Sequence, residues 1–271
     1  MKTGFKDLDK IVKIERGDLI IIASRPAMGK STLALNILSN VAIKDKKPSA
    51  FFSLDESMEK IVNRLIIKTA MVEADKFKIY NKYQKGEILK PKFTDDDWDR
   101  ISYGVNVLKN APIFIDATAP QTIEHILKKS CELKEKENIE LIIIDYIQLI
   151  QCDKSKLLSR ENEIEDILKE LKLLAKKLNV PIIVTSQLSR KLEERNDKRP
   201  VITDFTNTAF SLGYADKILF LYRYNKEEKS NITEIIVAKN ENGKIGTAEL
   251  GYMPEYCMFG NMVTFKDDEN G

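Results

Sequence analysis

Short apolar runs alternate with longer segments of helical periodicity along most of the chain. The runs are rich in β-branched residues and occupy residues 19–23, 50–53, 113–116, 141–145 and 181–185. Each run ends in a small or polar residue, and the ligand sites of α/β proteins lie at such strand ends. The alternation predicts an α/β fold in which helices flank a mostly parallel central sheet.

The most regular helical segment lies between the last two of these runs. Apolar residues recur there at steps of three and four with charged residues between them, at Ile164, Ile167, Leu168, Leu171, Leu174 and Leu178. This spacing predicts a helix with one buried stripe and a solvated opposite face. Further helices are expected to begin near residue 30 and to cover residues 58–70 and 122–135.

The rest of the chain is less regular. Residues 73–110 are mostly polar and charged with scattered aromatic residues, so we expect a helical insertion there rather than a second core. After residue 204 we expect strands at 217–222, 234–238 and 247–252, with a turn at Asn242-Gly243 between the last two. An antiparallel meander at the edge of the sheet is the simplest arrangement. Without a repeat or a Pro-rich linker, residues 1–271 are expected to form a single domain.

Composition excludes several classes of protein. Charged residues make up 32% of the chain, yet the net charge is only +2, so any nucleic-acid site must be local. The three cysteines lie far apart without the spacing of a zinc site, which favours a reducing cytosol. No apolar run reaches membrane-spanning length, so we expect a soluble, cytoplasmic protein with no membrane partner.

One strand-to-helix junction has the pattern of a phosphate-binding loop. The first apolar run leads into Ser24, Arg25, Pro26, Ala27, Met28, Gly29, Lys30, Ser31 and Thr32, which match the Walker A pattern with serine as the first residue. Backbone N–H groups in such a loop surround a β-phosphate, and the helix N-terminus adds positive potential. We therefore expect ATP as a cofactor, with Lys30 at the β- and γ-phosphates and the Ser31 hydroxyl on Mg²⁺.

Three other strand ends carry side chains suited to nucleotide hydrolysis. Asp145 closes the fourth run, as the Walker B aspartate does when it supports Mg²⁺ from a strand beside the loop. Asp55 and Glu56 follow the second run, where a carboxylate can polarise the attacking water, although the dipole of the next helix would also favour acids there. Gln187 follows the fifth run, where its amide can sense the γ-phosphate.

A series of short motifs spans nearly the whole chain. They are Thr3-Gly4-Phe5 with Leu8-Asp9, Gly17-Asp18-Leu19-Ile20, Arg25-Pro26-Ala27-Met28-Gly29-Lys30, Phe52-Ser53-Leu54, Asp145-Tyr146-Ile147-Gln148-Leu149, Ser186-Gln187-Leu188-Ser189-Arg190 and Asp197-Lys198-Arg199-Pro200. In these motifs the chain closely resembles the RecA-like ATPase domain of bacterial replicative DnaB-type helicases. The patterns Arg-Pro-x-Met-Gly-Lys and Asp-Tyr-x-Gln-Leu are more specific to that group than Walker motifs in general.

The resemblance implies a hexameric ring that hydrolyses ATP between subunits and translocates on single-stranded DNA during replication. It implies that Lys30 and Ser31 bind phosphate and Mg²⁺, that Asp145 supports the metal, and that Gln187 couples the γ-phosphate to the DNA side. Asp55 takes the place of the family's catalytic glutamate and is one methylene shorter.

Basic residues around position 195 are the candidates for DNA binding. Arg190, Lys198 and Arg199 belong to a segment that lies near the ring channel in the family. The acids Glu193, Glu194 and Asp197 are interspersed with them, so a solvated loop is at least an equal alternative.

Two segments depart from the family pattern. The DNA-facing loop, typically Asp-Leu-Arg-Glu-Ser-Gly, is Asp204-Phe205-Thr206-Asn207-Thr208-Ala209 here. The Lys-x-Arg-Asn-Gly segment, which supplies an arginine finger to the neighbouring subunit, is Lys239-Asn240-Glu241-Asn242-Gly243. Glu241 reverses the sign of that interaction, which leaves Lys239 to act in trans unless Lys244 or Arg223 approaches the site instead.

These departures keep other hypotheses open. A degenerate ATP-binding protein with weak or no hydrolysis could act as an accessory or regulator of a related helicase ring. A RecA-fold ATPase of the recombinase or clock type is a third possibility, against which the Asp-Tyr-x-Gln-Leu motif argues. Because the chain starts at the ATPase motifs, we expect an excised domain or a naturally short relative, without the N-terminal domain that contacts primase.

Overall fold

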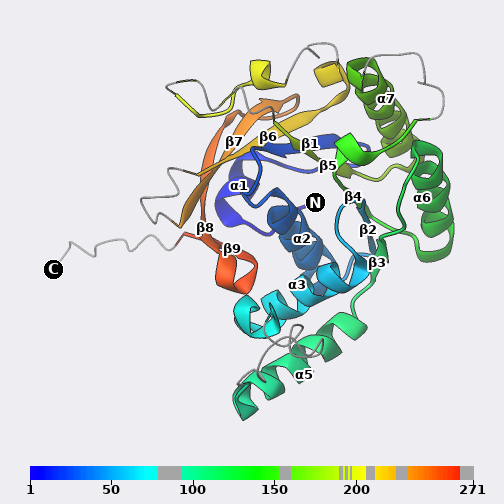
Figure 1. Cartoon of the computed structure of the whole chain (residues 1–271). Helices are drawn as coiled ribbons and strands as arrows, with labels where there is room; N and C mark the ends of the chain where they lie inside the picture. The colour runs from blue at the N-terminus through cyan, green and yellow to red at the C-terminus, as the bar shows by residue number, and fades with distance from the viewer. Residues whose placement is uncertain are drawn as a thin grey trace.

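The computed structural model describes residues 1–78, 93–152, 160–188, 192, 195, 197–205, 211–223 and 231–262. Within these residues, nine strands form one sheet in the order β3-β2-β4-β5-β1-β6-β7-β8-β9 (Figure 1). The strands are β1 Leu19–Ser24, β2 Ser49–Ser53, β3 Ile113–Asp116, β4 Leu141–Asp145, β5 Ile182–Gln187, β6 Lys217–Tyr222, β7 Ile232–Asn240, β8 Gly246–Met253 and β9 Met258–Asn261.

Strands β1 to β6 pair in parallel, and β7, β8 and β9 extend the sheet as an antiparallel meander. The α/β fold, the mostly parallel sheet and the antiparallel edge are confirmed. One feature goes beyond the prediction: β6 pairs antiparallel with β7, as a strand of the meander, and on its other side it pairs in parallel with β1. Strand β9 was missed, since its four residues include a glycine and an asparagine and have little β propensity as a group.

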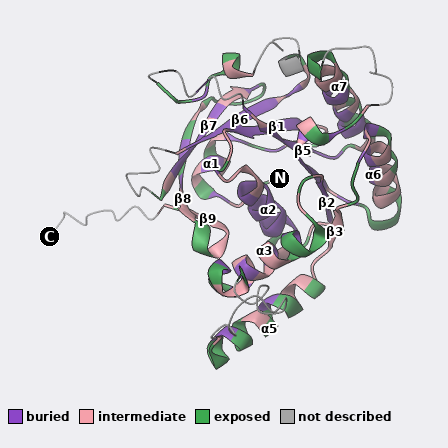
Figure 2. Ribbon diagram, in the orientation of Figure 1, coloured by how far each residue is buried: buried purple, intermediate pink, exposed green. Residues whose placement is uncertain are grey.

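Helices cover both faces of the parallel part of the sheet. The α-helices are α1 Lys6–Ile11, α2 Lys30–Ser39, α3 Met58–Ala70, α5 Asp95–Lys109, α6 Ile123–Glu137 and α7 Arg160–Leu178. Helices α1, α2 and α3 pack on one face and α6 and α7 on the other, with alternate strand residues in the two cores. Burial on both faces explains the uninterrupted apolar runs of the central strands (Figure 2). None of the described helices is long and apolar enough to cross a membrane.

The insertion predicted at 73–110 contains a regular helix in its described part. Helix α5 packs along α3, and the absent side chain of Gly104 allows the close approach, because a Cβ there would lie 3.2 Å from the Ala70 nitrogen. Much of the α5 surface is exposed (Figure 2). The described part of this segment therefore extends the helical layer around α3 and adds no strand to the sheet.

The carboxyl ends of the parallel strands meet at one edge of the sheet. Ser24 of β1 is in register with Gln187 of β5, and Ser53 of β2 is in register with Asp145 of β4. The expectation that Asp145 ends the strand beside the phosphate loop is wrong, because β5 lies between β4 and β1. Side chains must therefore reach across β5 for the two motifs to meet.

Candidate nucleotide site

The loop between β1 and α2 has the backbone geometry of a tight phosphate-binding turn. Gly29, directly before the helix, has a φ of 97°, a left-handed conformation that L side chains rarely adopt. A Cβ at this position would also lie 3.1 Å from Cζ of Phe259. The backbone conformation and the contact with Phe259 therefore both require glycine at this position. The N–H groups in the first turn of α2 face the loop.

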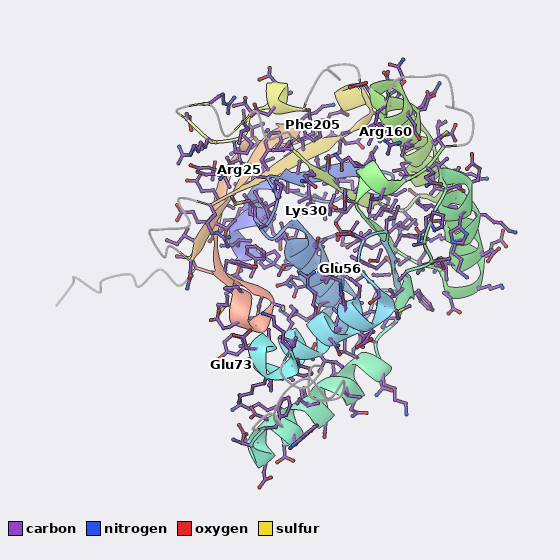
Figure 3. The ribbon with its side chains drawn as sticks, in the orientation of Figure 1. Arg25, Lys30, Glu56, Glu73, Arg160 and Phe205 are labelled. Carbon is purple, nitrogen blue, oxygen red and sulfur yellow. The ribbon has the colours of Figure 1, made fainter. Side chains whose placement is uncertain are left out.

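Lys30 and Asp145 meet across β5. Figure 3 labels Lys30 at the start of α2. Its ammonium group lies 3.3 Å from Oδ1 of Asp145, which is 2% exposed. Thr185 of the intervening strand donates its hydroxyl proton to the same carboxylate oxygen. Lys30 also lies 4.4 Å from the centre of the Tyr146 ring. The buried carboxylate therefore holds the lysine beside the loop, where a phosphate would compete for it.

The candidate ligands for a divalent cation are hard oxygens. Ser31 follows Lys30 in the first turn of α2, and Asp145 lies against that lysine. Among the described residues, no group of three or more His, Cys, Asp or Glu side chains could hold a metal. This donor set suits Mg²⁺ better than transition metals, because Mg²⁺ keeps several waters and takes one or two protein ligands plus phosphate oxygens.

The turn after β2 carries the two candidate bases in different surroundings. Asp55 is exposed, whereas Glu56 accepts a hydrogen bond of 2.8 Å from Arg64 of α3. Burial raises the pKa of the Tyr146 hydroxyl, and the charges of Asp55 and Asp145 raise it further. The charge of Asp55 therefore acts on the tyrosine whose ring contacts Lys30.

Gln187 is tied to the segment that follows β4. The side chain of Gln148 donates to the Gln187 carbonyl at 3.1 Å and to Oγ of Ser186 at 2.9 Å, and its Oε1 accepts from the Gln187 N–H at 3.2 Å. Arg160, at the start of α7, donates to the Gln148 carbonyl at 2.8 Å. Sequence motifs marked Gln148 without giving it a role, and no local signal pointed to Arg160.

An aromatic wall beside the loop was not predicted from the sequence. Tyr252 of β8 and Phe259 of β9 stack with ring centres 4.7 Å apart. The Arg223 guanidinium lies 4.7 Å from the Tyr252 ring centre and donates to the Ala27 carbonyl at 3.3 Å. The sequence offers Arg223 only as an alternative to the arginine finger, whereas the structure places it at the phosphate loop of its own chain. A flat aromatic face next to a cation suits stacking of a nucleotide base.

The residues proposed for DNA contact are only partly described. Arg199 forms an ion pair of 2.6 Å with Glu234 of β7, so its charge is already balanced, while Lys198 is exposed. Arg190 and residues 206–209 lie outside the described residues.

The position expected to act on a neighbouring subunit also has a local partner. Lys239 contacts Glu241 at 3.0 Å and donates to the Ala215 carbonyl. Both residues lie at the amino-terminal edge of the parallel strands, where Asn240 is in register with Lys217. This edge is opposite the phosphate loop of the same chain.

Comparison with known proteins agrees with this arrangement. Residues 1–261 match the family described as the DnaB-like helicase C-terminal domain. Replicative DNA helicase DnaB of Geobacillus stearothermophilus is 39% identical over 96% of this chain and 56% of its own length. Replicative DNA helicase DnaC of Bacillus subtilis (strain 168) is 38% identical over 98% of this chain and 57% of its own length.

Solved structures give the same result. A DnaB-like replicative helicase, studied with its interactions with primase, superposes with a TM-score of 0.87 at 31% identity over 97% of this chain and 63% of that chain. A solved ATPase domain superposes equally well at 32% identity, over 97% of this chain and 91% of that chain. This chain spans 56% and 57% of the lengths of the two replicative helicases named above. By sequence and by fold, it belongs to the DnaB-like helicase C-terminal domain family.

Proposed function

We propose that this chain is the motor domain of an ATP-dependent DNA helicase, which hydrolyses ATP at subunit interfaces and translocates on single-stranded DNA during replication. The observation that carries the proposal is the meeting of Lys30, Asp145 and Thr185 across β5 at the phosphate loop. The membership of the family supports it.

The nucleotide is held along the carboxyl edge of the sheet. Ser24 to Thr32 cradle the phosphates, with Lys30 at the β- and γ-phosphates, and Arg223 with Tyr252 stacks on the base. Ser31 and Asp145 would hold a Mg²⁺ ion, which would supply positive charge to neutralise the transferred phosphoryl group. Asp55 polarises the attacking water, because its carboxylate is exposed in the turn that follows β2 at the carboxyl edge of the sheet.

Coupling to DNA runs through the end of β5. Gln187 senses the γ-phosphate and is fixed by Gln148, so a change at the nucleotide is passed to the segment that follows β5. That segment contains Arg190, Lys198 and Arg199, the candidates for contact with the DNA backbone. We assign the chain a homo-oligomeric ring, in which Lys239 faces a neighbour's nucleotide, and a cytoplasmic location.

The proposal is tested by steady-state ATPase assays with and without single-stranded DNA, over a range of protein concentrations that allows ring formation. We expect DNA to stimulate turnover and Lys30→Ala to abolish it. Lys13→Ala is the matched control, because Lys13 is an exposed lysine at the opposite edge of the sheet. Failure of the unaltered protein both to hydrolyse ATP and to bind single strands contradicts the motor function.

A second function is favoured by one specific observation, the Lys239–Glu241 pair at the position of the arginine finger. It makes the chain an ATP-binding accessory or regulator of a related helicase ring. Calorimetry distinguishes the two functions, because a regulator binds ATP with Mg²⁺ and shows negligible turnover at every concentration.

A further inference from the structure

One arginine links the two sides of the nucleotide site. Arg64 of α3 donates from Nη1 to Oε2 of Glu56 at 2.8 Å and from Nη2 to Oγ1 of Thr32 at 2.5 Å. The Arg64 and Glu56 side chains are only 19% and 28% exposed. Because the guanidinium group is planar and rigid, two contacts made by one fork fix the position of both partners.

The two partners belong to the two halves of the site. Thr32 is 4% exposed and follows Ser31 in the first turn of the phosphate-binding helix α2. Glu56 belongs to the turn after β2 that also carries Asp55. Arg64 therefore joins the turn with the candidate base to the helix with the candidate metal ligand.

The turn is anchored on both sides of Asp55. The Leu54 N–H donates to the Asp145 carbonyl at 2.9 Å, which holds one side on β4. On the other side, the Glu56 carbonyl accepts from Oγ of Ser53 at 2.6 Å and the Glu56 carboxylate accepts from Arg64. Asp55 thus lies between a residue fixed to β4 and a residue fixed to α2.

The contacts also separate the two adjacent carboxylates. Arg64 holds the Glu56 carboxylate, whereas Asp55 is exposed and makes no hydrogen bond or ion pair with the part of the chain that the structure describes. A base must be free to approach the water that it polarises. Aspartate also has one side-chain bond fewer than glutamate with which to correct a misplaced backbone, so its position depends more strongly on the turn.

We propose that Arg64 is a positioning residue for ATP hydrolysis: it keeps Glu56 out of the reaction and holds Asp55 at a fixed distance from the phosphate-binding helix. The inference rests on the proposed ATPase function and assigns the polarisation of water to Asp55 alone. A displacement of about 1 Å at a reacting group can cost roughly 10²-fold in rate, which is the scale expected when this link is lost.

The kinetic test compares Arg64→Met with Arg64→Lys in the full chain. We expect Arg64→Met to lower kcat by at least about tenfold while KM and the affinity for a nonhydrolysable ATP analogue change less than about threefold. Arg64→Lys keeps the charge but lacks the forked guanidinium group, so its kcat should lie between those of the wild type and Arg64→Met. Arg100→Met is the control, since Arg100 forms an exposed ion pair with Asp96 on α5 and should leave kcat unchanged. An Arg64→Lys protein that folds and keeps the full kcat overturns the inference even if Arg64→Met does not fold.

The assignment of the two acids is tested separately. Glu56→Gln retains an acceptor for Arg64, so we expect kcat to fall less than about tenfold. Asp55→Asn removes the base and should cost about 10²-fold or more. If Glu56→Gln is as damaging as Asp55→Asn, Glu56 takes part in the reaction and the inference is wrong.

Amide hydrogen exchange gives a readout that does not depend on turnover. With Mg²⁺ and the nonhydrolysable analogue bound, we expect Arg64→Met to speed exchange at residues 54–57 and to leave residues 19–24 of β1 unchanged. Unchanged exchange at 54–57 overturns the link whether or not the protein hydrolyses ATP. Faster exchange there with unchanged kcat also overturns the positioning role. If the wild-type protein does not hydrolyse ATP but Arg64→Met still speeds exchange at residues 54–57, the proposed hydrolysis is contradicted and the link through Arg64 is not.

Discussion

A half-buried lysine near the phosphate-binding helix lies in an environment that opposes its charge. Lys68 of α3 donates to Oγ of Ser39 at 2.8 Å, and burial, together with the charge of Lys44, lowers its pKa from 10.5 to about 8. Burial disfavours the charged form, so the protonated lysine destabilises the folded state.

We expect Lys68→Met to raise the free energy of unfolding at pH 7 by about 1–3 kcal/mol, because the variant has no charge to bury. Below pH 8 the lysine is protonated in both states, so the gain is largest there. Between pH 8 and 10.5 the folded protein loses the proton while the unfolded chain keeps it, which stabilises the wild type and shrinks the gain. Urea unfolding at pH 7 and pH 10 measures the difference, and a gain that does not change with pH contradicts the explanation.

Gly29 offers a second test at the scale of one residue. Gly29→Ala forces a side chain into a φ of 97° and places a methyl group 3.1 Å from the Phe259 ring. Strain of this kind costs about 1–3 kcal/mol. We expect lower thermal stability together with weakened nucleotide binding. The matched variant Gly213→Ala should preserve both, since nothing lies within 4 Å of a Cβ there and no positive φ is required.

At the scale of elements, sequence patterns located the parallel strands and most of the helices but not their order in the sheet. The runs at β1, β2, β3, β4 and β5 could be found because each is buried on both faces or bounded by clear turns. The order of these strands in the sheet could not be predicted, since the position of β5 between β4 and β1 depends on how helices pack across the sheet. Local patterns could not predict the aromatic wall either, because Tyr252 and Phe259 are more than 220 residues from Gly29 in the sequence.

The start of α5 shows what local sequence does determine. Asp95, Asp96 and Asp97 form the first turn of the helix, and the structure shows a capping box between Thr94 and Asp97. Lys76 completes it with an ion pair of 2.7 Å to Asp97. This ion pair and the Thr94 N–H lower the pKa of Asp97 to about 2.

We expect Thr94→Ala to destabilise the protein by about 1 kcal/mol through loss of the cap. Ser102→Ala, at an exposed position of the same helix, should stay within about 0.5 kcal/mol of the wild type.

Because the pKa of Asp97 is depressed, its contribution to stability is present above pH 4 and is lost as the pH falls toward 2. Asp97→Asn should therefore reduce the loss of unfolding free energy between pH 4 and pH 2. The same loss in the variant and in the wild type contradicts this role of Asp97.

At the scale of the whole molecule, the turn between β7 and β8 cannot serve the nucleotide site of its own chain. Ser24 ends β1 at the carboxyl edge of the sheet, whereas Asn240 is in register with Lys217 at the amino edge. Six residues of strand separate the edges by about 20 Å. In the proposed ring, a charge at Glu241 can therefore act only on the γ-phosphate of a neighbouring subunit.

This geometry makes the effect of Glu241→Arg dependent on assembly. An arginine there restores a cation at the family's finger position, and finger cations contribute roughly 10³–10⁵-fold in rate in other ATPases and GTPases. We expect Glu241→Arg to raise turnover by at least about tenfold, and more when combined with Asp55→Glu, but only at concentrations where subunits associate. Adding subunits that carry both Lys30→Ala and Glu241→Arg to wild-type protein should also stimulate the wild-type sites, because the donor subunit needs no ATP of its own. An equal gain in the dilute monomer would place the turn at its own site and contradict the sheet geometry, and no gain at any concentration would favour the regulatory function.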